Sequence, residues 1–148
     1  MSPSAPSCLL DTNVLLAATD TSRRTHRAAL DLLNDDPRAH CVTPQIVREY
    51  LAVSTRPVEA NGLGLSPQTA TNNLDELLLD MTLLPEDART TARLTHLVRD
   101  GHALSRQVHD ANIAASALAH AVPVIVTDND QHFRRFSDLV TIETLSRR

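Results

Sequence analysis

Short apolar runs alternate with longer amphipathic segments along the whole chain. The apolar runs predict buried strands at residues 8–10, 40–42, 82–84, 123–127 and 139–142. Apolar positions at helical spacing predict helices at 22–35, 44–56, 67–78, 86–100 and 106–118, and a helical turn at 130–136. Strands alternating with helices predict an α/β fold of three layers, with a mostly parallel sheet of four to five strands and helices on both faces.

Residues at the predicted helix ends support this order of elements. A further helix is expected to start after the first strand, at Asp11-Thr12-Asn13. Hydroxyl N-caps followed directly by proline occur at Thr43-Pro44 and Ser66-Pro67. Ser105 is expected to cap the helix at 106–118, and Gly101 is expected to follow the end of the helix before it.

Length and composition restrict the class of protein. The 148 residues suit a single domain, with its core at about 8–142 and flexible ends at 1–7 and 144–148. No apolar run reaches the ~18–20 residues of a membrane span, and the N-terminus lacks the features of a signal peptide. We therefore expect a cytoplasmic protein without a membrane partner. Cys8 and Cys41 lie in apolar stretches and are expected to be reduced, buried thiols.

All 14 basic residues other than histidine are arginines, and the chain has no lysine. This excludes P-loop nucleotide hydrolases, protein kinases and Schiff-base or pyridoxal enzymes, since each requires a lysine. The codon bias of a GC-rich genome accounts for the absence itself. The net charge of −4 argues against a dedicated nucleic-acid-binding protein, unless a metal neutralises a cluster of carboxylates.

Four acidic residues stand where a parallel α/β sheet usually forms its sites, beyond the carboxyl ends of the strands. Asp11 and Asp128 directly follow predicted strands, Glu49 borders the buried stripe of its helix, and Asp110 has apolar neighbours near its helix start. Each alone has an ordinary explanation, as a helix cap, a solvated charge or a dipole partner. Together they would be costly unless paired or metal-bound, and such hard oxygen ligands favour Mg²⁺ or Mn²⁺.

The segments that carry these acids resemble, in order and spacing, the four motifs of PIN-domain ribonucleases, and in particular those of the VapC-type toxins of bacterial toxin–antitoxin pairs. They are Leu9–Leu16, Val47–Leu51, His109–Ala115 and Val126–Phe133. The resemblance implies a PIN-like fold and a metal-dependent endoribonuclease. Such an enzyme hydrolyses RNA phosphodiester bonds and leaves 5′-phosphate and 3′-hydroxyl ends. The resemblance also implies a cognate antitoxin and a homodimer.

By this resemblance, the metal-binding acids are Asp11, Glu49, Asp110 and Asp128. Asp11, Asp110 and Asp128 hold one or two Mg²⁺ or Mn²⁺ ions, and Glu49 also orients or deprotonates the attacking water. Candidates that position these groups or the substrate are Thr12, Asn13 and Thr127. Arginines that are candidates for contacting the RNA backbone, and that are equally well explained as surface charges, are Arg23, Arg24, Arg134 and Arg135.

The fourth acid departs from the family pattern. In many relatives it stands two residues after the threonine, where this chain has Asn129 between Asp128 and Asp130. Asp128 is favoured because it lies closer to the strand end. Asp130 is then an auxiliary ligand or a cap for the following turn.

Two other functions remain open from the sequence. One is a PIN-like nuclease of RNA processing that has no antitoxin, and the other is a catalytically silent module that binds RNA or protein. The presence of all four acids counts against the silent module. A stand-alone domain of this length favours the toxin over the processing nuclease.

Overall fold

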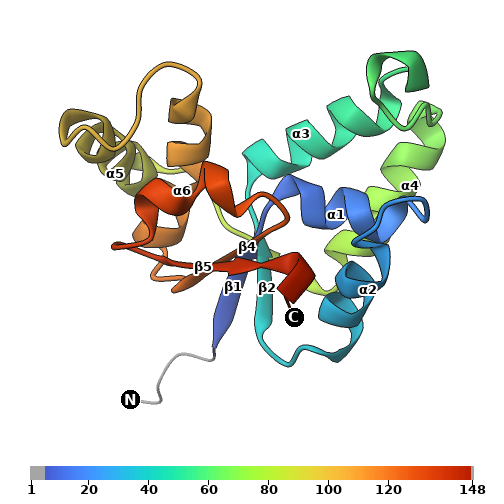
Figure 1. The fold of residues 1–148 in the computed structure, drawn as a ribbon, viewed down its shortest axis with the longest axis horizontal. Helices are drawn as coiled ribbons and strands as arrows, with labels where there is room; N and C mark the ends of the chain where they lie inside the picture. The colour runs from blue at the N-terminus through green and yellow to red at the C-terminus, as the bar shows by residue number, and fades with distance from the viewer. Residues whose placement is uncertain (1–5, 148) are drawn as a thin grey trace.

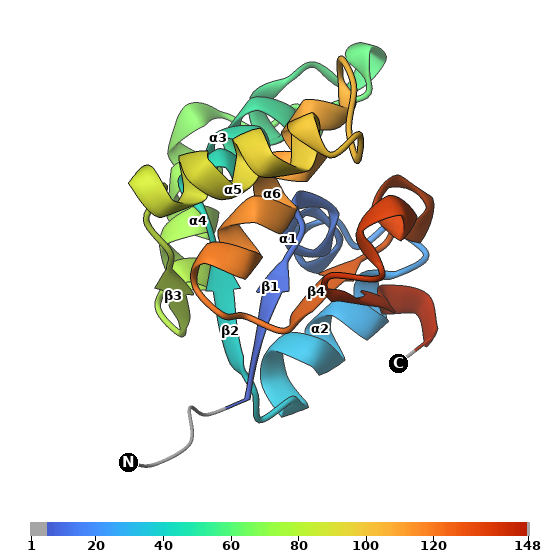
Figure 2. The ribbon, with the colours of Figure 1, turned by 90° about the vertical axis from the view of Figure 1, so that its left-hand side faces the viewer.

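A computed structural model describes residues 6–147 of the chain (Figure 1). Its sheet has the strand order β3-β2-β1-β4-β5, and every neighbouring pair is parallel. Figure 2 shows β1 between β2 and β4, at the centre of the sheet. The strands are β1 (Ser7–Leu10), β2 (Ala39–Val42), β3 (Met81–Leu83), β4 (Val124–Thr127) and β5 (Thr141–Thr144). The predicted parallel sheet is confirmed, with five strands.

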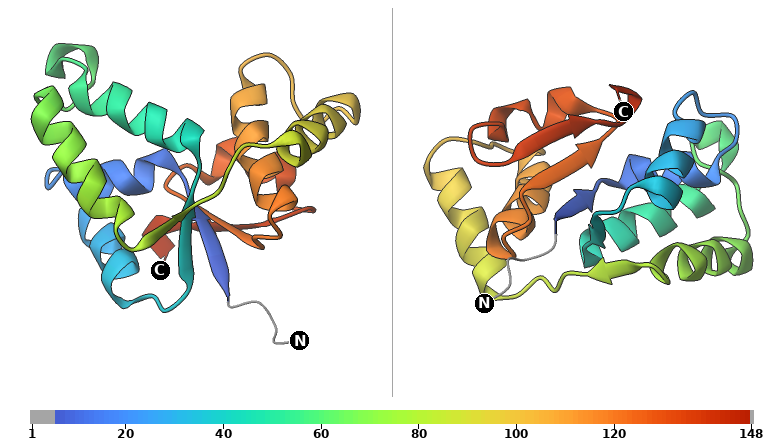
Figure 3. Two further views of the ribbon diagram at one scale, coloured as in Figure 1. Left: turned by 180° about the vertical axis from the view of Figure 1, so that it is seen from behind. Right: turned by 90° about the horizontal axis from the view of Figure 1, so that it is seen from below.

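The order of the strands decides which face each helix covers. The α-helices are α1 (Thr12–Thr19), α2 (His26–Asp35), α3 (Pro44–Thr55), α4 (Pro67–Leu78), α5 (Ala88–Arg99) and α6 (Gln107–Ala119). The chain steps from β1 to β2 to β3 in one direction and then returns across the sheet to β4. Because such crossovers are right-handed, α1–α4 lie on one face and α5 and α6 on the other (Figures 1 and 3). This confirms the three layers.

The core between these layers is mainly aliphatic. The three aromatic residues, Tyr50, Phe133 and Phe136, are fully buried within it. Cys8 and Cys41 are buried free thiols, as predicted. None of the described helices is long and apolar enough to cross a membrane.

Three helices begin later than the sequence predicts. Helix α5 starts at Ala88 rather than at residue 86, because the Asp87 carboxylate caps it by accepting from the backbone N–H groups of Arg89 and Thr90. Helix α2 starts at His26 rather than at residue 22, because the Asp20 carboxylate accepts hydrogen bonds from the backbone and hydroxyl of Ser22 and holds a turn there. The prediction that Ser105 caps the helix at 106–118, which corresponds to α6, is wrong. Ser105 has a φ of 52°, and α6 starts at Gln107, whose side chain accepts from the Leu104 backbone N–H.

The last strand is also displaced. It begins at Thr141 rather than at residue 139, because the backbone N–H groups of Leu139 and Val140 both donate to the Phe136 carbonyl and close a turn there. That turn follows two short 3₁₀ segments, η2 (Asp130–His132) and η3 (Arg134–Phe136). Leu145 is fully buried, so the packed chain extends beyond Ile142. Of the ends expected to be flexible, 1–7 and 144–148, residues 1–5 and 148 lie outside the described residues, and Ser7 begins β1.

Other helix ends agree with the sequence. Gly101 follows α5 with a φ of 81°, which glycine adopts without strain, and its N–H donates to the Val98 carbonyl. The hydroxyls of Thr43 and Ser66 cap α3 and α4 as predicted. Helix α3 therefore begins directly at the carboxyl end of β2, which brings its first turns to the edge of the sheet.

Candidate active site

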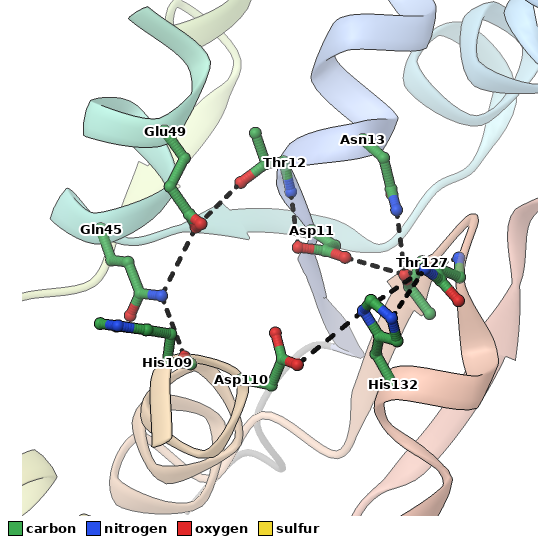
Figure 4. Close-up of polar contacts among 10 residues, drawn as sticks. Asp11, Thr12, Asn13, Gln45, Glu49, His109, Asp110, Thr127 and His132 are labelled. Atoms are coloured by element: carbon green, nitrogen blue, oxygen red, sulfur yellow. Dashed lines mark hydrogen bonds and ion pairs between the residues drawn. The ribbon is translucent and has the colours of Figure 1, made fainter. Parts of the chain in front are cut away.

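Asp11 lies at the carboxyl end of the central strand and caps helix α1. Its side chain is almost completely buried (9% exposed). One carboxylate oxygen accepts from the Thr12 backbone N–H at 2.8 Å, and the other accepts from the Thr127 hydroxyl at 2.8 Å (Figure 4). Burial, with smaller contributions from the negative charges of Glu49 and Asp110, raises the pKa of Asp11 to about 6 in spite of these two bonds.

Glu49 reaches the same space from helix α3. Its Oε1 accepts from the Thr12 hydroxyl at 3.3 Å and from the Gln45 amide at 3.4 Å (Figure 4). Burial raises the pKa of Glu49, the two hydrogen bonds lower it, and the charge of Asp110 raises it. Among the described residues, both hydrogen bonds of the Glu49 carboxylate are made by Oε1, and none engages Oε2.

Asp110 comes from the opposite layer, on the first turn of α6. Its carboxylate faces Asp11 and Glu49 in the close-up view (Figure 4). Burial raises the pKa of Asp110, whereas His132 and Arg135 lower it. The His132 Nδ1 atom lies 3.9 Å from Asp110 Oδ2. Three of the four predicted acids are thus brought together at one edge of the sheet.

Thr127 joins β4 to this group through a hydroxyl whose direction is fixed. Its oxygen accepts from the Asn13 amide at 3.3 Å and from the Asn129 backbone N–H at 3.0 Å. With both acceptor positions in use, its proton points to Asp11. Asn13 in turn accepts from the Asp128 backbone N–H at 3.0 Å. Threonine 127 and asparagine 13, both candidates from the sequence, therefore hold the ends of β1 and β4 together.

A family model for the PIN domain matches residues 8–139, which is most of the chain. The chain belongs to the PIN domain family. Among curated proteins, no sequence matches it at a significant level.

Solved structures of PIN toxins share the fold. The VapBC2 complex of Rickettsia felis, bound to promoter DNA, matches with a TM-score of 0.67 and 21% identity over 93% of this chain and 98% of that chain. DNA-bound VapBC from Salmonella typhimurium matches with a TM-score of 0.68 and 19% identity over 95% and 98%. VapC20 of Mycobacterium tuberculosis, a toxin that cleaves the sarcin–ricin loop, matches with a TM-score of 0.61 and 14% identity over 80% and 86%.

The two candidates for the fourth acid of this PIN domain make different contacts. The Asp128 carboxylate accepts from the hydroxyl of Thr25, the residue before α2, at 3.2 Å. Asp130 opens η2, caps no helix, and pairs with Arg134 at 3.4 Å on the exposed surface. Both carboxylates are thus engaged by side chains other than those around Asp11, Glu49 and Asp110.

Three residues around the site were not identified from the sequence. They are Thr25, Gln45 and His132. Gln45 precedes Glu49 by one helical turn, and this spacing could have placed both on the same face of α3. Thr25 and His132 have no such local signal, because each reaches the acids only through the tertiary fold.

The acids of this PIN domain fit a hard divalent cation in their chemistry. Carboxylate oxygens are the ligands that Mg²⁺ and Mn²⁺ prefer, and a cation would offset the burial and, to a lesser degree, the charge repulsion that raise the pKa of Asp11. Among residues 6–147, however, no three His, Cys, Asp or Glu side chains are grouped closely enough to form a ready coordination shell.

The candidate RNA-binding arginines differ in their surroundings. Arg23 pairs with Asp20 at 3.5 Å, and Arg134 pairs with Asp130. Arg24 is exposed, and Arg135 lies close enough to Asp110 to lower the pKa of that carboxyl. Arg135 is therefore the candidate with a direct electrostatic connection to the acids.

Proposed function

We propose that this PIN domain is a metal-dependent endoribonuclease and the toxin of a toxin–antitoxin pair. The observation that carries the proposal is that Asp11, Glu49 and Asp110 face one another from three separate elements. Gathering like charges beside apolar surface opposes folding unless a cation compensates them. A silent binding module has no need for such an arrangement.

Asp11, Asp110 and Asp128 would hold Mg²⁺ or Mn²⁺. When bound, such an ion lowers the pKa of a water molecule and stabilises negative charge on the phosphate and the leaving oxygen. Two contacts favour Asp128 over Asp130 as the fourth acid. Asp128 directly follows Thr127, which bonds Asp11, and its backbone is held by Asn13, whereas Asp130 is neutralised by Arg134.

Glu49 would orient the attacking water or accept its proton. Thr12 and Gln45 hold Oε1, which leaves Oε2 to receive a hydrogen bond from water. The raised pKa of Glu49 makes its carboxylate a better proton acceptor than an ordinary surface glutamate. Thr12 and Thr127 would keep Glu49 and Asp11 in fixed orientations while the substrate binds.

The toxin assignment is supported by the structural neighbours. Those from Rickettsia felis and Salmonella typhimurium are complexes of a toxin with its antitoxin, and the neighbour from Mycobacterium tuberculosis is an RNA-cleaving toxin. We therefore propose RNA as the substrate and a cognate antitoxin as the protein partner.

Cleavage of total RNA in Mg²⁺ or Mn²⁺, with and without EDTA, tests this function. We expect the wild type to cleave, and we expect EDTA and Asp11→Asn each to abolish cleavage. Asp75→Asn, on the exposed face of α4, removes the same charge away from the site and serves as the matched control. Full activity of Asp11→Asn would refute the site, and co-purification with the product of an adjacent small gene would test the antitoxin.

A further inference from the structure

Helices α3 and α6 lie on opposite faces of the sheet and diverge from its edge (Figure 1). Glu49 and Asp110 can face each other only if the first turns of these helices are held at a fixed separation. The side chain of Gln45 spans that separation and is buried (7% exposed). Its Nε2 donates to the His109 carbonyl of α6 at 2.9 Å and to Glu49 Oε1 at 3.4 Å (Figure 4).

The orientation of the Gln45 amide is determined by its partners. A carbonyl oxygen only accepts hydrogen bonds, so the nitrogen of the amide must face His109. The oxygen of the amide then faces Asn112, whose Nδ2 donates to it at 2.8 Å. Residues 109 and 112 stand on either side of Asp110, so Gln45 holds the helical turn that carries this acid.

A further bond ties the start of α3 to the second layer. The Gln45 backbone N–H, which has no partner within the first turn of a helix, donates to Glu86 Oε1 at 3.0 Å. Glu86 lies just before α5, which packs along α6. The same residue therefore joins α3 to the layer of α5 and α6 through both its backbone and its side chain.

We propose that Gln45, together with Asn112, is a positioning residue that sets the separation of Glu49 and Asp110 across the two layers. The inference rests on the proposed function, because it concerns the alignment of the acids. A purely structural hydrogen bond would contribute to stability alone. A positioning role also requires that loss of the Gln45 amide changes how the acids bind a cation and activate water.

Gln45→Met tests the inference, because methionine retains the length of the side chain without its hydrogen bonds. We expect the affinity for Mn²⁺, measured by calorimetry, to fall at least about tenfold, as for other residues that orient metal ligands. We expect kcat to fall similarly, with a smaller change in KM for RNA. Leu74→Ala shortens a buried side chain of α4 and so also lowers stability, but it should change neither the Mn²⁺ affinity nor kcat below its melting temperature.

A metal-free measurement separates the inference from the proposed function. The Gln45 hydrogen bond lowers the pKa of Glu49, so Gln45→Met should raise that pKa in a carboxyl-carbon NMR titration, and Leu74→Ala should not. Asn112→Ala removes one bond only and serves if Gln45→Met fails to fold. Its effect on Mn²⁺ affinity should combine less than additively with that of Gln45→Met, since both act through one amide.

Three results would overturn either the positioning role of Gln45 or the proposed function. If Gln45→Met lowers the melting temperature but leaves Mn²⁺ affinity, kcat and the Glu49 pKa at wild-type values, then Gln45 is merely structural. Strict additivity with Asn112→Ala would also contradict the shared role. If the wild type neither binds Mn²⁺ nor cleaves RNA, the proposed function fails, and an unshifted Glu49 titration would then refute the positioning of this acid as well.

Discussion

Two clusters of charged side chains in this protein are built on opposite principles. In one, Arg38 donates to Asp36 at 2.8 Å and 2.9 Å and to Glu143 at 2.7 Å and 3.1 Å, so that one cation joins two anions. In the other, Asp11, Glu49 and Asp110 bring three anions together. In the described part of the chain no arginine forms an ion pair with any of them, although His132 and Arg135 lie near Asp110. Only the first arrangement is explained by folding alone.

The pKa values express this difference. The hydrogen bonds with Asp36 and Glu143 raise the pKa of Arg38, so the charged form of the arginine is favoured. Burial raises the pKa of all three acids in the second cluster, so their charged forms are disfavoured. A cluster that opposes its own ionisation indicates a ligand of positive charge, whereas a compensated cluster indicates a structural role.

The largest expected effect comes from removing charge in the like-charged cluster. Asp11→Asn should lower RNA cleavage by more than about 100-fold, because even groups that only orient a metal ligand account for 10–100-fold. The same variant should be more stable than the wild type without metal at pH 7.5, by up to about 2 kcal/mol, since one lost hydrogen bond offsets part of the gain. Cleavage assays and urea unfolding measure the two effects. If Asp11→Asn were less stable than the wild type and still cleaved RNA, the cluster around Asp11 would have the structural role given to the cluster around Arg38.

The pH dependence of stability should follow from the same residue. The folded-state pKa of Asp11 is about 6, above its ordinary value of 3.8, so the folded protein binds more protons between these values. The free energy of unfolding of the metal-free protein should therefore fall by about 3 kcal/mol as pH rises from about 4 through 6. The difference between wild-type and Asp11→Asn unfolding curves isolates this contribution. A flat difference would show that Asp11 titrates normally.

Removing the cation of the compensated cluster should lower stability and leave RNA cleavage unchanged, which is the opposite of the result expected for Asp11→Asn. Arg38→Ala removes the guanidinium hydrogen bonds to Asp36 and Glu143 and should lower the free energy of unfolding by about 2 kcal/mol, the typical contribution of hydrogen bonds to a charged group. RNA cleavage per folded molecule should stay unchanged. Arg38→Lys retains the charge without the forked geometry and should recover only part of the stability. A loss of cleavage in folded Arg38→Ala would mean that this cluster also serves the site.

The smallest effect is expected at Arg135, the arginine that lowers the pKa of Asp110. If Arg135 contacts one phosphate of the substrate, Arg135→Gln should reduce the slope of log affinity against log salt by about 0.7, the value for single strands. Arg99→Gln, at the end of α5, is the charge-matched control. Both arginine substitutions are made in the inactive Asp11→Asn protein, and RNA binding measured at several salt concentrations compares their slopes. Equal slopes would assign Arg135 to the ordinary surface.

Much of the fold follows from local signals in the sequence. The strands with β-branched runs and the helices opened by Thr43 and Ser66 lie close to the predicted positions, because hydroxyl caps and buried apolar runs act over a few residues. The errors occur where distant residues or backbone turns decide the ends. Ser105 has the chemistry of a cap, yet the Gln107 side chain binds the preceding backbone instead. Leu139 has the composition of a strand, yet the turn around Phe136 uses its N–H.

The residues of the site also divide into those that local sequence signals mark and those that only tertiary contacts bring in. Asp11 and Asp110 were identifiable because a strand end and an apolar helix start mark them in the sequence. The choice of Asp128 over Asp130 as the fourth acid remains a proposal, since two acids on one short segment differ only in their tertiary contacts. Gln45 was missed because a glutamine at a helix start is ordinary in itself. Its partners, His109 and Asn112, lie more than sixty residues away.

The central position of β1 also affects when the site can form during synthesis. The bond between Asp11 and Thr127 joins residues 116 positions apart, and α6 with Asp110 is translated only shortly before β4. A nascent chain that has not yet released β4 from the ribosome has Asp11 at a strand without its second neighbour and without its hydroxyl donor. The acids are therefore assembled only after Thr127 has been translated. While residues before β4 are being made, the growing polypeptide therefore lacks the complete site, as a result of the order of its strands.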